Sequence, residues 1–399
     1  MKILYVASDQ TIPGTTGGSI HVAAVAEGLA HLNHDVHVVV TPGGKFPAGP
    51  VHWIALPPPA GRKELRWVNT RALRRIAREL RPDVVVERYY NFGGEGIAAA
   101  KDVGAVAVLE VNAPVVDYPG SSKRFLDRAL IFEPMRRWRE RICRHSDLIV
   151  TPAAGILPAD TPRSKILEIE WGADVDRFRP GATGEVPFAR PADTVAVFAG
   201  AFRHWHGTIH IVTAIRELRA RGRRDIGAVF IGDGPELPRV RHAAAGLDGV
   251  IFAGALPHDR LPACLAACDI GVAPFDPDTH PSLSLGFYWS PLKIFEYMAA
   301  GLPVVAPAID RIPNLVGHNS EGLLYDSAIP TGLPHAFAAL ADPELRHRLG
   351  RAARERAVRD YSWSSHCLAL DAAIKATRVA APAPAPANQP DRAEDRVRD

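Results

Sequence analysis

The chain opens on a strand, a glycine-rich loop, a helix and a second strand. Ile3–Ala7 is a short apolar run typical of a buried strand, and Val36–Val40 is another. Between them, a loop that contains Gly17 and Gly18 leads into Ile20–Leu32, where apolar residues recur near helical spacing. Two strands joined by a helix in this way belong to a parallel sheet, which binds ligands at the carboxyl ends of its strands.

The same alternation of strands and helices continues along the chain in two series. The further strands expected are Val84–Glu87, Ala105–Val111 and Leu148–Thr151 in the first series, and Val195–Ala199, Gly227–Ile231, Val250–Phe252, Ile270–Ala273 and Pro303–Ala306 in the second. A long helical region is expected near Lys123–Cys143. Two successive series predict an α/β protein with two doubly wound parallel-sheet domains and the main cleft between them.

Composition along the chain suggests where the domains end. Residues 1–180 are predicted to form the first domain and residues 194–361 the second, joined by a linker at 181–193 that is rich in Gly, Pro and Ala. A last helix is expected at 362–379. Residues 380–399 begin with alternating Ala and Pro and then carry charge, which is typical of a disordered tail.

Overall composition excludes several classes of protein. A length of 399 residues suits about two domains. Four scattered cysteines are too few for a disulfide framework, and we find neither a signal peptide nor an apolar run that could span a membrane. The net charge of +3 is too small to indicate a nucleic-acid partner. We therefore expect a cytoplasmic protein.

The strongest signal for a binding site is the segment that begins at Ser290. Ser290 is expected to cap a helix whose first position is Pro291. The free amides and positive dipole of a helix start favour phosphate, and Lys293 would neutralise its charge. Glu296, three residues further on, is placed to bind sugar hydroxyls. The alternative is that Lys293 and Glu296 form an ordinary surface pair.

This segment resembles the retaining glycosyltransferases of family 4. In that family a Glu-x7-Glu motif precedes a stretch of small residues and Gly-Xaa-Pro-Val-Val, and Glu296 with Ala299–Ala306 matches its second half. Three other segments also resemble the family: Trp171–Pro180, Phe230–Pro235 and Val250–Gly254. The resemblance covers most of residues 1–378. It implies the GT-B fold, in which two Rossmann-like domains face each other across a cleft and a C-terminal helix crosses back to the first domain.

The resemblance also implies that the second domain binds a nucleoside-diphosphate sugar, with Glu296 on the ribose. The expected donor-binding residues are Gly17, Gly18, Arg203, His206, Gly232, Gly234, Ser290, Leu292, Lys293, Ile294 and Glu296. This sequence departs from the family at the first glutamate, which is Tyr288, and at two cationic positions, which are Ala201 and His206. We expect Arg203, His206 and Lys293 to contact the diphosphate, unless Arg203 and His206 are ordinary loop residues.

Candidate catalytic residues also come from the first domain. Glu110 and Asn112 end a predicted strand and share a face, where many relatives have a histidine near position 112. We take Glu110, Asn112, Lys293 and His206 as the catalytic candidates. The alternative for Glu110 and Asn112 is that they cap a loop.

The resemblance implies a glycosyltransferase that moves a sugar, with retention, from a UDP-, GDP- or dTDP-sugar to an acceptor hydroxyl. A polysaccharide, a lipid-linked sugar or a small metabolite would each suit as acceptor. We expect no metal and no added cofactor. Two alternatives stay open: a nucleotide-sugar-binding protein without transferase activity, which Ala201, His206 and Tyr288 favour, and a sugar-nucleotide epimerase. A dinucleotide oxidoreductase is disfavoured because the first loop does not read Gly-x-Gly-x-x-Gly.

Basic residues concentrate in two segments of the first domain, residues 62–81 and 123–144. Apolar residues such as Trp67 and Phe125 interleave with them, so the predicted helices are amphipathic. They either dock on anionic lipid, which would hold the protein at the inner face of a membrane, or present solvated faces over a core. The sequence does not indicate an oligomeric state.

Overall fold

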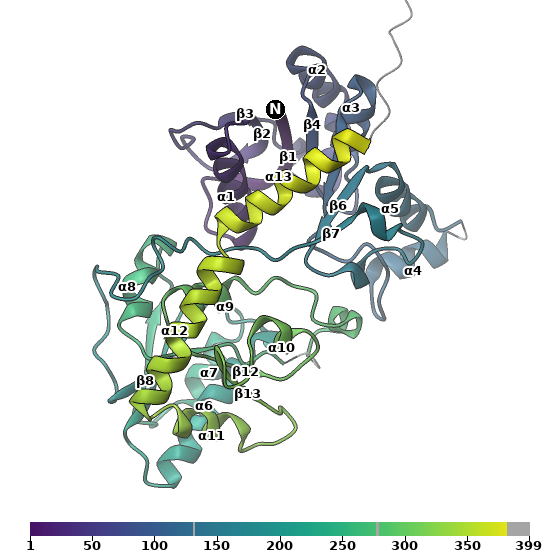
Figure 1. Ribbon diagram of the computed structural model, residues 1–399. Helices are drawn as coiled ribbons and strands as arrows, with labels where there is room; N and C mark the ends of the chain where they lie inside the picture. Colours follow the sequence, from purple (N-terminus) through teal and green to yellow (C-terminus); the bar gives the residue numbers. More distant parts are fainter. Residues whose placement is uncertain (131, 277–278, 381–399) are drawn as a thin grey trace, which may run out of the picture.

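The computed structural model describes residues 1–130, 132–276 and 279–380, which form two domains, each built on a parallel sheet (Figure 1). In the first sheet the strands lie in the order β3-β2-β1-β4-β5-β6-β7. These strands are β1 (Lys2–Ile12), β2 (Asp35–Pro42), β3 (His52–Ala55), β4 (Val84–Arg88), β5 (Val106–Glu110), β6 (Leu148–Thr151) and β7 (Ile166–Glu168). The helices are α1 (Gly17–His31), α2 (Thr70–Leu80), α3 (Glu95–Val103), α4 (Ser122–Ala129) and α5 (Pro134–His145).

In the second sheet the strands lie in the order β10-β9-β8-β11-β12-β13. They are β8 (Thr194–Ala199), β9 (Ile226–Ile231), β10 (Val250–Gly254), β11 (Ile270–Val272), β12 (Val304–Pro307) and β13 (Gly322–Tyr325). The helices are α6 (Thr208–Ala220), α7 (Leu237–Ala243), α8 (Leu261–Ala266), α9 (Leu292–Ala299), α10 (Ile312–Leu315), α11 (Gly332–Ala339) and α12 (Pro343–Asp360), and α13 (Trp363–Ala380) follows.

Strand β1 shows why these sequences form buried parallel strands. Leu4 and Val6 pack on one face with residues of α2, α3 and α5, whereas Ile3 and Tyr5 pack on the other face with α1 and α13. Because helices cover both faces, every side chain from Ile3 to Ala7 is apolar and fully buried. The alternation predicted from the sequence is confirmed as two doubly wound parallel sheets.

The chain between the two sheets and helix α13 both join the domains. Ala173 and Phe178, which precede the predicted linker, pack in the core of the second domain. Helix α13 lies on the first domain, where His34 Nε2 is 2.9 Å from Asp371 Oδ1 and Arg378 donates to Asp83 at 2.8 Å. In Figure 1 the yellow helices α12 and α13 run in succession from the second domain to the first. The tail predicted at 380–399 lies outside the described residues from 381 onward.

Three local expectations were wrong. The helical region near Lys123–Cys143 is two helices, and the second begins at Pro134 after Glu133, whose φ of 46° cannot continue a helix. Gly17 and Gly18 belong to the first turn of α1 rather than to a loop. The strands β3, β7 and β13 were not anticipated, because edge strands are short and only partly covered.

Candidate functional site

The first turns of α1 and α9 lie against each other across the domain boundary. Thr16 caps α1, since its hydroxyl accepts a hydrogen bond from the Ser19 amide at 3.2 Å. A Cβ atom on Gly17 would lie 3.6 Å from Leu292 Cδ1, at the start of α9. Each helix start carries partial positive charge from its free amides. Their approach creates a place suited to an anion.

Lys293, in the first turn of α9, adds an ionisable amine to this region. Its Nζ is shielded from solvent and has no hydrogen-bond partner among the described residues. It lies 4.2 Å from the centroid of the Phe198 ring and 5.5 Å from that of Phe275. Burial lowers the pKa of Lys293 to about 7, although the carboxylate of Glu296 opposes this shift. An ammonium group buried without a partner is unfavourable, so this site is prepared for an anionic ligand.

His206 and Arg203 lie in the loop after β8. His206 Nδ1 is hydrogen-bonded to the carbonyl oxygen of Ala201. Burial and the positive charge of Lys293 lower the pKa of His206 to about 3, so the imidazole is neutral at pH 7. The structure therefore does not give His206 the positive charge expected of it. Arg203 is exposed, and its guanidinium carbon lies 5.9 Å from the centroid of the Trp205 ring.

Gly232 and Gly234, which follow β9, pack against the backbone of the loop after β8. Their amides are not free for a ligand. A Cβ on Gly232 would lie 2.0 Å from the Gly200 carbonyl oxygen, and one on Gly234 would lie 2.6 Å from that of Phe202. The Gly232 amide donates to the Gly254 carbonyl at 2.8 Å, and the Gly234 amide donates to the Asp233 carboxylate at 2.7 Å. Glycine is needed here for close backbone packing.

Ser290 does not cap α9, in contrast to the expectation from the sequence. The residue at the cap position is Pro291, and no side chain caps this helix. The Ser290 hydroxyl instead donates to Glu170 Oε2 at 2.9 Å and accepts from the Trp171 amide at 2.7 Å. The amides of Leu292 and Ile294 donate to the carbonyls of Ser290 and Pro291 at 3.0 and 2.8 Å. The first turn of α9 is thus partly satisfied by its own backbone.

Glu296 faces a cavity between the two domains. Its side chain is buried, and Oε1 accepts a hydrogen bond from His258 Nε2 at 2.7 Å. A cavity of about 260 Å³ brings together Gly14, Ser19 and Glu27 of the first domain with His258 and Glu296 of the second. The sequence did not identify His258 as a partner of Glu296; only the fold brings the two side chains together.

Glu110 lies in a buried network rather than on an open strand end. Tyr5 donates to Glu110 Oε2, Arg88 donates to Oε1 at 2.6 Å, and His21 Nε2 lies 2.9 Å from Oε1. Burial alone would raise the pKa of Glu110, but His21, Arg88 and Tyr5 hold it well below its ordinary value. Asn112 Nδ2 also donates to this carboxylate. Glu110 is therefore an ionised carboxylate whose oxygens are occupied by protein groups.

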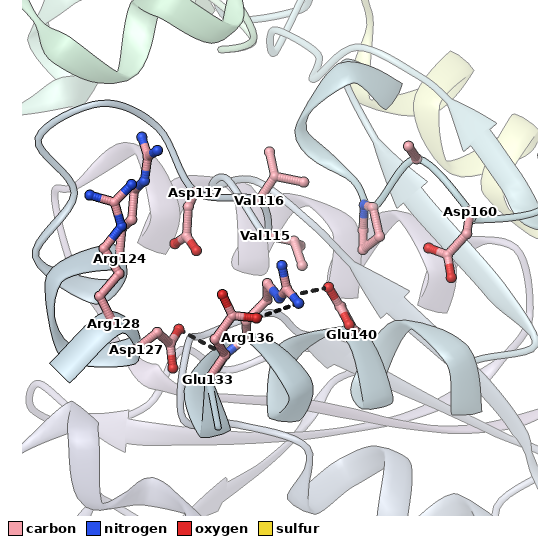
Figure 2. A pocket seen from close by; sticks show the side chains of 12 residues that line it. Val115, Val116, Asp117, Arg124, Asp127, Arg128, Glu133, Arg136, Glu140 and Asp160 are labelled. Carbon is pink, nitrogen blue, oxygen red and sulfur yellow. Dashed lines mark hydrogen bonds and ion pairs between the residues drawn. The ribbon is translucent and has the colours of Figure 1, made fainter. Parts of the chain in front are cut away.

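A larger cavity of about 600 Å³ lies in the first domain (Figure 2). It is bordered by α4, α5 and the chain that follows β5 and β6. Arg136 pairs with Glu133 and Glu140 on its floor, and Arg124 and Arg128 extend together from α4 at one side. Within the described part of the chain, Arg124 and Arg128 form no ion pair. The cavity therefore offers these two guanidinium groups beside Glu133 and Glu140, both of which pair with Arg136.

The described geometry brings together only some of the candidates named from the sequence. Gly17, Lys293 and His206 lie around one prospective anion site, with Glu296 nearby at the domain boundary. Gly18 packs on Gln10, whose Oε1 would lie 2.3 Å from a Cβ on that glycine.

The sequence matches two described families, one in each domain. Residues 15–157 match the family described as Glycosyltransferase Family 4, and residues 193–342 match the family described as Glycosyl transferases group 1. The chain is 27% identical over 307 residues to the D-inositol 3-phosphate glycosyltransferase of Acidothermus cellulolyticus, which covers 70% of this chain and 64% of that protein. This chain therefore covers less than two thirds of the length of that relative.

A second relative and a solved structure match a larger share of this chain. The GDP-mannose-dependent alpha-mannosyltransferase of Corynebacterium glutamicum is 25% identical over 389 residues, 93% of this chain and 87% of that protein. The structure of Anabaena HepE in complex with UDP matches with a TM-score of 0.68 at 17% identity, over 94% of this chain and all of that one. The likeness in structure confirms the GT-B fold, and the two family matches lie on its two domains. This chain belongs to the group 1 glycosyltransferases of family 4.

Proposed function

We propose that this protein transfers a sugar, with retention of configuration, from a nucleoside-diphosphate sugar to an acceptor hydroxyl. The observation that carries the proposal is the buried amine of Lys293 in the first turn of α9, which has no hydrogen-bond partner among the described residues, while the helix start of α1 packs against Leu292 of the same turn. A diphosphate would supply the negative charge that this arrangement leaves unmatched. The family to which the chain belongs makes a sugar nucleotide the natural source of that diphosphate.

The relatives support this class of donor without fixing its base. One is named GDP-mannose-dependent, and a structure of similar fold was determined with UDP. In our proposal Glu296, positioned by His258, binds the ribose hydroxyls, and Lys293 with the amides of Gly17 and Gly18 binds the diphosphate. Arg203, exposed in the loop after β8, is our further candidate for binding these phosphates. UDP-, GDP- and dTDP-sugars all remain candidate donors.

In the proposed reaction the bond between the anomeric carbon and the diphosphate oxygen breaks, and a bond to the acceptor oxygen forms on the same face. The acceptor proton passes to the departing diphosphate oxygen, so that the atoms and charges balance. Negative charge grows on the diphosphate as the first bond breaks, and Lys293 and the helix starts stabilise it. This route uses cationic residues of the chain itself to balance the charge.

We propose that the acceptor binds to the first domain. Because the oxygens of Glu110 are occupied by Tyr5, Arg88 and His21, we assign Glu110 the role of orienting Asn112 rather than of touching substrate. Asn112 receives a hydrogen bond at Oδ1 from the Trp171 indole at 2.9 Å. Asn112 therefore occupies a fixed position at the end of β5, where an acceptor would approach.

A panel of sugar nucleotides tests the proposal. We expect free UDP, GDP or dTDP to raise the melting temperature of the protein, because a ligand bound by the folded state stabilises it. We expect Glu296→Ala to remove most of this shift, whereas Glu344→Ala, at an exposed site on α12, leaves it unchanged. Binding of no nucleotide by the wild-type protein, or equal binding by Glu296→Ala, would contradict the assignment of the donor site.

We further propose that the first domain docks on anionic lipid through α4, Leu130 and Phe132. Phe125 is 74% exposed and Phe132 is 70% exposed, and Leu126 and Leu130 are also exposed. Arg124, Arg128 and Arg137 accompany them, and no ion pair is found for these arginines in the part of the chain that the structure describes. Apolar tips beside unpaired guanidinium groups suit insertion into an anionic headgroup layer. No described helix is long and apolar enough to cross a membrane.

Sedimentation with vesicles tests this docking. We expect the wild-type protein to sediment with vesicles rich in phosphatidylglycerol and not with pure phosphatidylcholine. The double variant Phe125→Ser and Phe132→Ser should remain in solution. Ile329→Ser is the matched control, because Ile329 is a 52% exposed apolar residue of the second domain. Equal sedimentation of the double variant and the control would refute docking through α4.

A further inference from the structure

Glu170 and Trp171 lie where the chain leaves the first sheet, directly after β7 and before the second domain. Neither residue has the character of a flexible linker. Glu170 is mostly buried, with 15% of its side chain exposed, and the carbonyl of Glu170 is hydrogen-bonded to His366 Nδ1 on α13 at 2.7 Å. The two residues are therefore fixed to the helix that crosses between the domains.

On one side this pair is attached to the second domain beside α9. The Ser290 hydroxyl accepts from the Trp171 amide and donates to Glu170. Arg311 forms a two-pronged ion pair with the Glu170 carboxylate, in which Nη2 lies 3.0 Å from Oε2. Arg311 also donates to the carbonyls of Phe287 and Trp289 at 2.7 and 2.8 Å. Glu170 is thus held by the segment that leads into the proposed donor helix.

On the other side the Trp171 indole is attached to the first domain. Its N–H donates to Asn112 Oδ1 at 2.9 Å, and its ring centroid lies 4.5 Å from that of His21. A Cβ on Gly17 would lie 3.7 Å from Trp171 Cζ3. A single side chain therefore contacts Asn112 just after β5, the first turn of α1 at Gly17 and the buried His21 further along α1.

We infer that Glu170 and Trp171 couple the donor helix α9 to the acceptor residue Asn112 and so set the distance across the reaction cleft. The inference rests on the proposed function, since it assigns these residues to the positioning of donor and acceptor. Hydrogen bonds run continuously from Asn112 through Trp171 to Ser290 and through Glu170 to Arg311. Trp171 is a positioning residue, because it acts through Asn112 and Ser290.

The variant Trp171→Phe tests this coupling with little loss of packing. It retains an aromatic ring against His21 and removes the indole N–H that binds Asn112. The control is Trp138→Phe, because the indole of Trp138 also makes one hydrogen bond at 2.9 Å, to the Gly93 carbonyl, away from the cleft. Both variants lose one hydrogen bond of the same kind, so their effects on global stability should be similar.

We expect Trp171→Phe to lower kcat by roughly 3- to 10-fold, the effect of one hydrogen bond, with the nucleotide Kd changed less than about twofold. Trp138→Phe should keep the wild-type kcat. Spin labels at positions 79 and 344, one exposed site in each domain, should report a broader distance distribution for Trp171→Phe. Glu170→Gln, which weakens the pair with Arg311, should broaden it as well.

The outcomes separate this inference from the proposed function. Wild-type kcat and an unchanged distance distribution in Trp171→Phe would overturn the coupling while leaving the transferase assignment intact. Conversely, a wild-type protein that turns over no sugar nucleotide would refute the proposed function, and the distance measurement would still decide whether Trp171 sets the domain separation. A fall in kcat shared equally by Trp138→Phe would mean a general loss of stability and would also overturn the coupling.

Discussion

Binding of a nucleoside diphosphate should draw a proton onto Lys293. In the free protein, burial lowers the pKa of this ammonium to about 7, because no described group hydrogen-bonds to it. A diphosphate beside Nζ would favour the charged form and return the pKa to the ordinary range of lysine. Above pH 7 the bound protein then carries more protons than the free protein, and the difference must come from the buffer.

The size of this uptake follows from the two protonation states. At pH 8 a group with a pKa of about 7 is only about 10% protonated, whereas a lysine with its ordinary pKa is almost fully protonated, so binding should take up about 0.9 proton. The nucleotide itself contributes little to the proton uptake at pH 8, since the second pKa of a terminal phosphate is about 6. The same linkage predicts that Kd rises by up to about tenfold for each pH unit above 7.

Titration calorimetry in buffers with different ionisation enthalpies measures the uptake directly, as the slope of observed enthalpy against buffer enthalpy. Lys293→Met should weaken binding by about 10- to 150-fold, as expected for the loss of a charge-assisted hydrogen bond, and should abolish the slope. Lys101→Met is the control, because Lys101 is 44% exposed in a surface pair with Asp147. A wild-type slope near zero, or the same slope in Lys293→Met, would refute the placement of the diphosphate at Lys293.

Three further predictions concern the stability of the scaffold. Arg66 is fully buried between Asp9 at 2.9 Å and Glu95 at 2.5 Å, so Arg66→Met should destabilise the protein by about 3–5 kcal/mol in urea unfolding; a loss below about 1 kcal/mol would contradict this. In the wild-type protein burial raises the pKa of the adjacent Glu87 from 4.5 to about 7, so its contribution to the free energy of unfolding should fall as the pH rises through that interval, and a contribution that rises would contradict the sign. Gly207 has a φ of 58°, and a Cβ there would lie 1.8 Å from the Pro274 carbonyl oxygen, so Gly207→Ala should lower the melting temperature; an unchanged value would show that the loop after β8 is not constrained as described.

Much of the architecture could be predicted because parallel strands covered on both faces leave a strong local signal. Runs such as Ile3–Ala7 are apolar at every position, and the glycines and helices that follow mark the turns between them. The edge strands β3 and β7 lack this signal because solvent reaches part of each one. The break before Pro134 depended on the backbone of Glu133, which the hydrophobic pattern does not reveal.

The candidate site also contains residues that the sequence predicted and residues that it did not. Lys293 and Glu296 were found because they follow one short segment that resembles a family motif. Ser290 was misassigned, since its hydroxyl bonds with Glu170, a residue 120 positions away in the chain. The contact between Trp171 and Asn112 likewise joins residues 59 positions apart. Such partners are fixed by the packing of two domains, and local spacing carries no information about them.

Transfer of a sugar from a nucleoside diphosphate, with retention, is the reaction that we propose for this chain. Proton NMR of reactions with UDP-, GDP- and dTDP-sugars, with water as the slow acceptor, tests it most directly. We predict that at least one donor is consumed and that the first free sugar has the anomeric configuration of the donor before mutarotation. A first product of inverted configuration, or the survival of every donor in the panel, would contradict the claim.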